Sequence, residues 1–140
     1  MIVKIKKLEK NSKIPSYALK GDAGLDLTAV SRTYDIDGNI VYGTGLAFEI
    51  PEGYVGLIFP RSSNAKKTLI LSNSVGILDS NYRGEVIFKF KPTELHIISY
   101  NIGDRIGQLI IIPYPQIEFK EVEELSKTDR NTGGYGSTGK

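Results

Sequence analysis

Short apolar or alternating runs recur along the chain, and residues that favour turns separate them. This pattern predicts strands at 2–5, 25–30, 46–50, 54–59, 68–71, 85–90, 95–98 and 105–112. No segment has sustained helical periodicity, and only residues 64–68 are expected to form one turn of helix. Many short strands with closely spaced turns indicate an all-β sandwich or barrel.

The last part of the chain has a different composition from the rest. Residues 109–112 are apolar without alternation, so we expect that strand to be buried on both faces. From about residue 126 the sequence becomes polar and glycine-rich, and such a segment cannot bury enough apolar surface to order itself. We expect one domain at 1–125, followed by a flexible arm at 126–140.

The composition removes several kinds of site. The 140 residues include no cysteine and a single histidine, His96, so disulfides, thiolate zinc sites and multi-histidine metal sites are excluded. We expect His96 on a strand face. If the protein is an enzyme, its acid or base should be a carboxylate and any metal a hard ion held by oxygen.

The charge and hydropathy pattern also limits partners and location. The net charge of +2 is too small to indicate duplex nucleic acid as a partner. No apolar run is long enough to cross a bilayer, and the alternating N-terminus is unlike a signal peptide. We expect a protein of the cytoplasm or, in a eukaryote or virus, of the nucleus.

Basic residues stand beside small or polar residues in several separate segments: Arg61, Arg83, Arg105 and Arg130. This placement suggests loops that converge on one anion, although solvated surface arginines are the common alternative. Pro60 ends a strand just before Arg61 and two serines, a set that suits a phosphate. An ordinary turn would have the same composition.

The segment 73–84 is the richest in candidate chemistry. Residues 73–76 are expected to form a tight reversal, with Gly76 in the positive-φ position. Asp79 and Tyr82 follow, and they suit a water-activating base and a flat wall for a sugar ring. Gln108 enters the apolar strand and must either bond the backbone or reach a ligand.

The tail combines glycines, hydroxyls, Arg130 and the single aromatic Tyr135. Glycines let backbone N–H groups converge on an anion, and an aromatic ring among them suits a lid that stacks on a planar base. It is not a Walker A loop, since the chain stops at Lys140. A terminus of accidental composition is the alternative, but Arg130 and Tyr135 favour a functional arm.

Together these segments resemble the motifs of the trimeric deoxyuridine triphosphate pyrophosphatases, the dUTPases. The five motifs read here as 23–27, 60–63, 73–84, 103–109 and the tail from 130, in the family's order. The resemblance implies a distorted jelly-roll, a barrel-like sandwich. It also implies hydrolysis of dUTP to dUMP and pyrophosphate by water attack on the α-phosphorus, which limits uracil in DNA and supplies dUMP for thymidylate synthesis.

The resemblance also implies a role for individual residues. Asp79 matches the general base, and Tyr82 the residue that packs on deoxyribose. The other groups matched to substrate contacts are Asn73, Ile77 and Leu78 in the hairpin that reads uracil; Arg61, Ser62, Ser63 and Gln108 at the phosphates; and Arg130, Tyr135, Gly136, Ser137 and Thr138 in the arm. Asp26 is expected to be structural or to contact a metal through water.

The family uses Mg²⁺ held mainly by the triphosphate, and its sites are shared within a homotrimer, so the resemblance implies the same here. Four positions depart from the family pattern: Ser63-Asn64 replaces a frequent Gly-Leu, Asn131 a glycine, and Tyr135 a phenylalanine. The nearest alternative enzyme is a deoxycytidine triphosphate deaminase, for which Glu85 would be the catalytic glutamate. A nucleotide-binding regulator of the same fold is the alternative outside catalysis.

Overall fold

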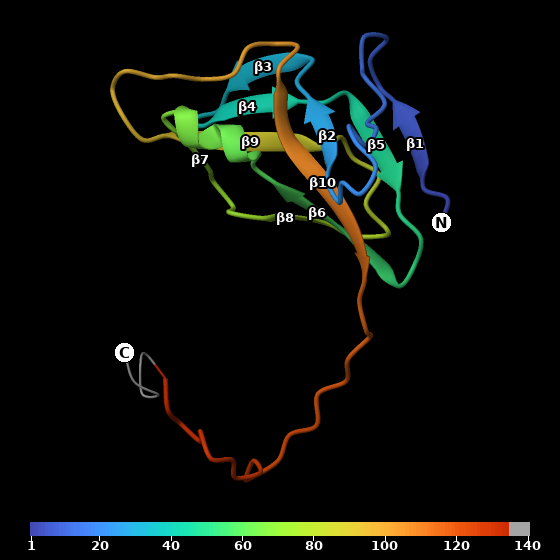
Figure 1. Ribbon diagram of the computed structural model, residues 1–140, viewed down its shortest axis with the longest axis vertical. Helices are drawn as coiled ribbons and strands as arrows, with labels where there is room; N and C mark the ends of the chain where they lie inside the picture. The colour runs from blue at the N-terminus through green and yellow to red at the C-terminus, as the bar shows by residue number, and fades with distance from the viewer. Residues whose placement is uncertain (135–140) are drawn as a thin grey trace.

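The computed structural model describes residues 1–134 and contains ten strands and one short 3₁₀ helix. The elements, in chain order, are β1 (Lys4–Lys7), β2 (Leu25–Thr28), β3 (Ser31–Tyr34), β4 (Ile40–Gly43), β5 (Leu46–Glu49), β6 (Tyr54–Phe59), η1 (Ser62–Lys66), β7 (Leu69–Leu71), β8 (Gly76–Leu78), β9 (Ile87–Pro92) and β10 (Arg105–Pro113). Figure 1 shows the strands gathered into one body, from which the last part of the chain leads away.

Two four-stranded sheets form the body, with strand orders β2-β10-β6-β8 and β3-β4-β9-β7, and β1 pairs with β5 beside them. All of the pairings are antiparallel. Gly107 on β10 lies against the ring of Phe88 on β9, so the two sheets pack face to face with no room for a side chain at this point. The all-β sandwich is confirmed, and its sheets are open rather than closed into a barrel.

Alternating side chains build the core between the sheets. On β9, Phe88 and Phe90 are fully buried, whereas Ile87 and Lys89 face outward. Tyr42 on β4 meets the Phe90 ring edge-on at a centroid distance of 6.0 Å. Each buried aromatic side chain contributes roughly 1.5–3 kcal/mol to folding, so this cluster fixes the register of β4 against β9.

Several sequence expectations about strands were wrong. The strand predicted at 95–98 is a loop in which Leu95 is fully exposed, and His96 therefore lies on no strand. This loop is tied to Thr68, whose hydroxyl accepts a hydrogen bond from the Ile98 amide and donates one to the His96 carbonyl. Strands β3, β4 and β8 were not predicted, whereas the single turn of helix was, and it appears as η1.

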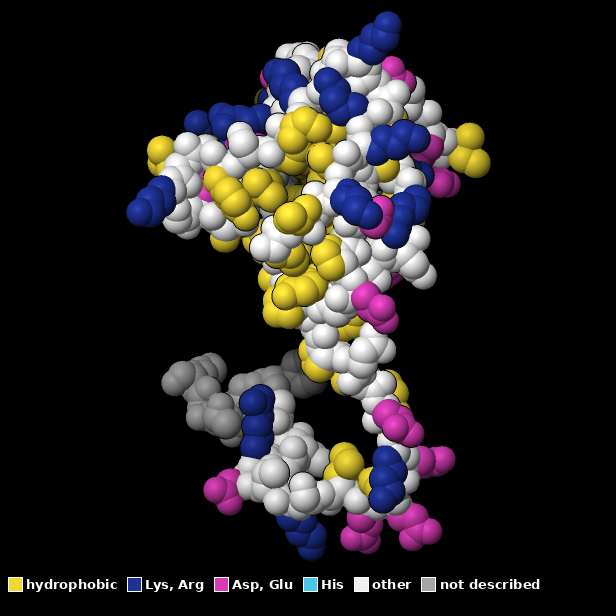
Figure 2. Space-filling view, turned by 90° about the vertical axis from the view of Figure 1, so that its right-hand side faces the viewer, with side chains coloured by type: hydrophobic (Ala, Val, Ile, Leu, Met, Phe, Trp, Pro, Cys, Tyr) yellow, Lys and Arg dark blue, Asp and Glu magenta, His cyan; other side chains and the backbone are white. Residues whose placement is uncertain are grey.

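The apolar stretch of β10 is also less buried than predicted. Leu109 is fully buried, but Ile110 and Ile111 are only half-buried and Ile112 is exposed. The outer face of this strand has no covering layer within the described part of the chain. Figure 2 shows hydrophobic side chains gathered on one face of the body. In residues 1–134 no helix is long and apolar enough to span a membrane.

Candidate functional site

An arginine pocket lies at the β2 edge of its sheet. Asp26 on β2 accepts a hydrogen bond from Arg61 Nε at 2.7 Å on one carboxylate oxygen and from Arg105 Nη1 at 2.9 Å on the other. The Asp26 and Arg61 side chains are about one-fifth and one-quarter exposed. These groups line a cavity of about 470 Å³ with Ser62 and Gln108. Asp22 also lines the cavity, so two guanidinium groups stand beside two carboxylates and the formal charges balance. The guanidinium N–H groups that Asp26 does not occupy are the donors that would suit an anion.

Gln108 lines the pocket beside Asp26, and Ser63 contacts Arg61 next to it. Gln108 faces Asp26 across the β10–β2 ladder and donates to the Pro60 carbonyl at 3.3 Å. Its amide also fills the space where a Cβ of Gly24 would lie, so a larger residue there would displace the Gln108 amide. Ser63 Oγ accepts from Arg61 Nη1 at 3.3 Å. The Gln108 amide therefore lines the pocket and also bonds the Pro60 carbonyl.

Asn64 and Tyr100 hold the turn that carries Arg61 and the serines. Asn64 Oδ1 accepts from the Tyr100 hydroxyl at 2.9 Å, and Asn64 Nδ2 donates to the Leu69 carbonyl at 2.8 Å. Burial raises the pKa of Tyr100 above its ordinary value of 10.0, which keeps this hydroxyl protonated as a donor. Asn64, one of the residues that departs from the family pattern, therefore stabilises the turn through hydrogen bonds to Tyr100 and Leu69.

The turn that carries Asn73 joins the two sheets. Strand β7 pairs with β9 and β8 pairs with β6, so the strands on either side of this turn belong to different sheets. The positive φ in this turn belongs to Ser74, at 60°, and the expectation for Gly76 was wrong. Gly76 is extended on β8, where a Cβ would collide with the side chain of Ile58. Asn73 is exposed next to Ser74, and Ile77 on β8 is also exposed, whereas Leu78 is buried.

Asp79 and Tyr82 follow β8 in an exposed loop. The Asp79 carbonyl accepts from the Tyr82 amide at 3.0 Å, and the Tyr82 hydroxyl donates to the Glu85 carbonyl at 3.1 Å. Gly84 has no side chain where the Tyr82 ring lies, so the ring folds back over it. The Asp79 carboxylate makes no hydrogen bond or ion pair within residues 1–134. It is open to a water molecule.

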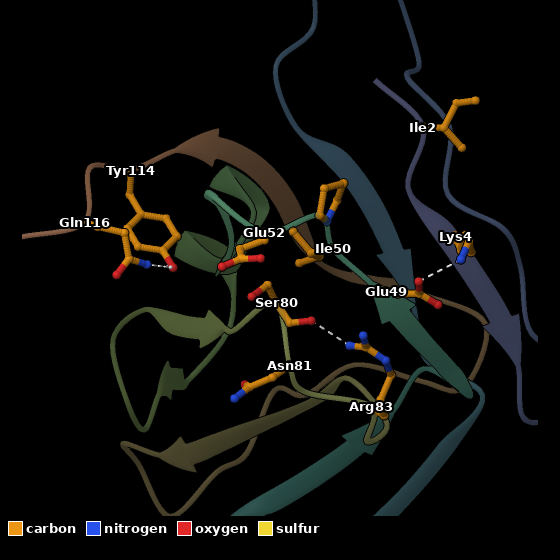
Figure 3. Close-up of a pocket in the computed structure, with 11 residues that line it drawn as sticks. Ile2, Lys4, Glu49, Ile50, Glu52, Ser80, Asn81, Arg83, Tyr114 and Gln116 are labelled. Carbon is orange, nitrogen blue, oxygen red and sulfur yellow. Dashed lines mark hydrogen bonds and ion pairs between the residues drawn. The ribbon is translucent and has the colours of Figure 1, made fainter.

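Arg83 holds the backbone of this loop. Its Nη1 donates to the carbonyls of Ser80 and Tyr82, at 2.6 and 2.9 Å. Figure 3 shows the Arg83 side chain turned toward Ser80 at the edge of a cavity of about 760 Å³, with Glu49 of the Lys4–Glu49 ion pair on the same side. This cavity borders the Asp79 loop, and its lining includes Arg83 but none of the residues matched to substrate contacts.

The Asp79 loop and the arginine pocket lie at opposite edges of one sheet. Strands β10 and β6 separate β2 from β8, and three strand spacings amount to roughly 14 Å. Gln108 on β10 pairs with Asp26 on one side and with Phe59 on the other, so Asp26 and Phe59 lie at the same height in the sheet. Asp79 follows Leu78, which pairs with Gly56, three residues before Phe59. The offset along the strands adds roughly 13 Å. One ligand phosphate cannot contact both groups of the same chain, because reacting atoms must lie about 3–3.5 Å apart.

The four arginines do not converge within one chain. Arg61 and Arg105 meet at Asp26, Arg83 bonds its own loop, and Arg130 Nε donates to the Gly133 carbonyl at 3.0 Å. After Pro113 the described chain contains no further strand. Asn131 has φ of 42°, a conformation in which asparagine can replace glycine. The predicted contacts Tyr135, Gly136, Ser137 and Thr138 lie outside the described residues.

Glu85 is engaged away from Asp79. Its Oε1 accepts a hydrogen bond from the Gly45 amide at 2.7 Å, in the connection between β4 and β5. A carboxylate that holds a backbone amide is a structural group in this arrangement. The contact does not favour the deaminase alternative, which needs Glu85 free beside a base.

Sequence reasoning did not identify three residues that shape the site. Arg105 was noted only as one of four arginines, although its position in the 103–109 motif is a usable signal. Asn64 was noted only as a departure from the family pattern, and Tyr100 was not noted. The two residues are 36 positions apart, and no local pattern indicates their contact.

The acidic side chains of the site suit a metal ion that is held largely by the phosphates of a bound ligand. Within the described residues no three acidic or histidine side chains form a cluster that could bind an ion alone. Asp26 already accepts from two arginines. Mg²⁺ commonly binds through one or two carboxylates, water and substrate phosphates, and this site fits that arrangement.

Comparisons with known proteins agree on one family. The family model described as dUTPase matches residues 10–139. The deoxyuridine 5'-triphosphate nucleotidohydrolase of Nautilia profundicola is 43% identical over 142 residues and covers the full length of both chains. The protein of that name from Corynebacterium glutamicum is 41% identical over 143 residues, which cover 99% of this chain and 95% of the relative.

Solved structures give the same result. A point mutant of the dUTPase from Staphylococcus bacteriophage 80alpha, solved with dUpNHpp, superposes with a TM-score of 0.85 at 28% identity, covering 99% of this chain and 98% of that one. A point mutant of the dUTPase from phage phi11 of S. aureus has a TM-score of 0.75 at 28% identity, over 89% and 98% of the two chains, and is described as coordinating a structural Mg(II) ion. The chain belongs to the dUTPase family.

Proposed function

We propose that this protein hydrolyses dUTP to dUMP and pyrophosphate. The observation that carries the proposal is the family match over residues 10–139, which spans every group that the reaction needs. Its substrate is a DNA precursor, so the enzyme would act in the cytoplasm, or in the nucleus of a eukaryotic or virus-infected cell. It would limit uracil in DNA and supply dUMP for thymidylate synthesis.

In this proposal the free carboxylate of Asp79 accepts a proton from a water molecule as that water attacks the α-phosphorus. The bond to the bridging oxygen breaks, and pyrophosphate leaves with the electron pair. A positioned general base contributes about 10²–10⁴-fold to such a step. Tyr82 packs against the deoxyribose, and Asn73 with the backbone of Ile77 and Leu78 bonds uracil.

The arginine pocket would bind the phosphates. Arg61, Ser62, Ser63 and Gln108 contact phosphate oxygens, and the arm adds Arg130, Tyr135, Gly136, Ser137 and Thr138 over the nucleotide. When bound to the triphosphate, Mg²⁺ would neutralise part of its charge, with Asp26 contacting the ion through water. Enclosure by the arm would exclude bulk water from the phosphates.

We further propose that the active enzyme is a homotrimer with shared sites. The estimated separation between Asp79 and the arginine pocket supports sharing, because a second copy must bring one of them to the other. The segment 114–125, which leads from β10 to the arm, carries exposed apolar side chains that a neighbour would cover: Tyr114, Ile117, Phe119, Val122 and Leu125. Exposed apolar groups gathered in this way are typical of protein interfaces.

The test is pyrophosphate release from dUTP, dCTP, dTTP and UTP, each with and without Mg²⁺. We expect turnover of dUTP alone, with Mg²⁺ increasing the rate. Formation of dUTP from dCTP would support the deaminase alternative instead. Tight dUTP binding without turnover would support the regulator.

A further inference from the structure

The turn that carries Asn73 is tied to the turn between β3 and β4. Ser72 Oγ donates a hydrogen bond to Asn39 Oδ1 at 2.6 Å. Asn39, only 8% exposed, donates through Nδ2 to both carboxylate oxygens of Asp35, at 3.1 and 2.9 Å. Lys89 Nζ donates to Asp35 at 3.1 Å. A continuous polar chain, Lys89–Asp35–Asn39–Ser72, therefore ends one residue before Asn73.

This polar chain has a fixed geometry. Asp35 Oδ1 also accepts from the backbone amides of Asn39 and Asp37, at 2.8 and 3.1 Å. The hydrogen bonds from Asn39, and secondarily the charge of Lys89, lower the pKa of Asp35 to about 2, so it remains a charged acceptor near neutral pH. Ser72 is held a second time, because its amide donates to the Lys89 carbonyl at 2.9 Å.

Beyond Ser72 the turn is held by backbone hydrogen bonds within it, among them one from the Val75 amide to the Asn73 carbonyl at 2.6 Å. The side chain of Asn73 makes no hydrogen bond within residues 1–134. Ser74 has a positive φ, a conformation that a non-glycine residue keeps only where its surroundings hold it. Its amide donates to the Leu71 carbonyl, on the other side of Ser72. These bonds shape the turn, and the Ser72 side chain ties it to the turn between β3 and β4.

We propose that Asn39 and Ser72 are positioning residues for base recognition. They set where the Asn73 amide meets the base, and so how strongly the enzyme prefers uracil to other pyrimidines. This inference rests on the proposed role of Asn73. Recognition by hydrogen bonds discriminates strongly only when donor and acceptor are fixed, because a displaced amide serves the right base no better than a wrong one.

The test compares kcat/KM for dUTP and dCTP, whose bases differ in their hydrogen-bonding groups, in Ser72→Ala, Asn39→Ala and the double variant. We expect each single variant to lower the preference for dUTP about fivefold, the effect of one lost hydrogen bond, mainly through KM. The double variant should lose no more than either single one, because both break the same link. Ser72→Thr keeps the hydroxyl and should restore the preference. Asp37→Ala is the matched control, since its side chain makes no contact in this link, and should change nothing.

Asn73→Ala, measured in parallel, separates the two proposals. If Asn73→Ala leaves the preference unchanged, the role of Asn73 is wrong. If Asn73→Ala lowers it while Ser72→Ala does not, the positioning role of Ser72 is overturned, and a lower melting temperature alone would assign a structural role. If the double variant lost the preference for dUTP by the product of the two single effects, the positioning role of Asn39 and Ser72 would also be overturned. Should Asn39→Ala fail to fold, Ser72→Ala and Ser72→Thr carry the test.

Discussion

The arginine pocket and the Asp79 loop lie at opposite edges of the same sheet. Charged side chains are paired with each other in the pocket, whereas the Asp79 carboxylate in the loop is unpaired within residues 1–134. In the pocket, Asp26 is bonded by Arg61 and Arg105, so the side chains are fixed before any ligand arrives. In the loop, Arg83 fixes the backbone while the carboxylate of Asp79 stays free in the described structure. A prearranged cation set suits binding, and a free carboxylate suits proton transfer.

The largest expected effect tests the free carboxylate. Asp79→Asn keeps the shape of the side chain but removes its basicity, so turnover of dUTP should fall about 10²–10⁴-fold. Binding of a non-hydrolysable dUTP analogue, measured by calorimetry, should change little. Unchanged turnover would show that Asp79 is not the base, and lost binding would assign it to recognition.

The next test asks whether the two edges serve one site from different copies. Arg61→Ala removes a phosphate ligand and leaves Asp26 with one partner fewer, so it should be nearly inactive alone. Mixed with Asp79→Asn and re-assembled, it should regain activity, with about a quarter of the sites intact in random trimers. The control is Asp79→Asn taken through the same re-assembly by itself, which should stay inactive. No recovery in the mixture would place both groups in one copy's site and contradict sharing.

The contrast between the edges also explains what the sequence could predict. Asp79, Tyr82 and Gly84 are close in sequence, and their contacts follow from local turns, so a motif reveals them. The sheets were predicted less evenly. Strand β9 alternates clearly and was found, whereas Ser31–Tyr34 is exposed throughout and carries no apolar pattern that would have revealed β3.

Long-range partners were beyond the sequence. Asp26 and Arg105 meet only because β2 and β10 are paired, and no local pattern reports that pairing. The loop at 95–98 failed for the opposite reason. Its alternation suits a strand, but its amides and carbonyls bond Thr68 instead of a neighbouring strand. Tertiary context decides such segments.

A smaller effect should come from loosening the pocket without touching its charges. Tyr100→Phe removes the hydroxyl that supports Asn64, and with it one hydrogen bond worth about 1 kcal/mol. KM for dUTP should rise about fivefold while kcat holds. Tyr42→Phe, which removes the hydroxyl that bonds the Tyr100 backbone, is a control for general loss of stability. An equal rise of KM in both variants would mean that the turn depends on general stability of the core rather than on the Tyr100–Asn64 hydrogen bond.

The smallest effect is on stability at low pH. It tests whether the charge of Asp35 contributes to holding Asn39 and Ser72. Asp35 has its pKa lowered from 3.8 to about 2, chiefly by hydrogen bonds from Asn39. A lowered pKa stabilises the folded state above the unfolded value, and that contribution disappears as pH falls from about 4 toward 2. The melting temperature of the wild type should therefore drop more between pH 5 and about pH 3 than that of Asp35→Asn. Asp37→Asn, in the same turn, should follow the wild type. Equal slopes for all three proteins would show that Asp35 carries no special acid sensitivity, and the support behind Ser72 would then be a matter of geometry rather than charge.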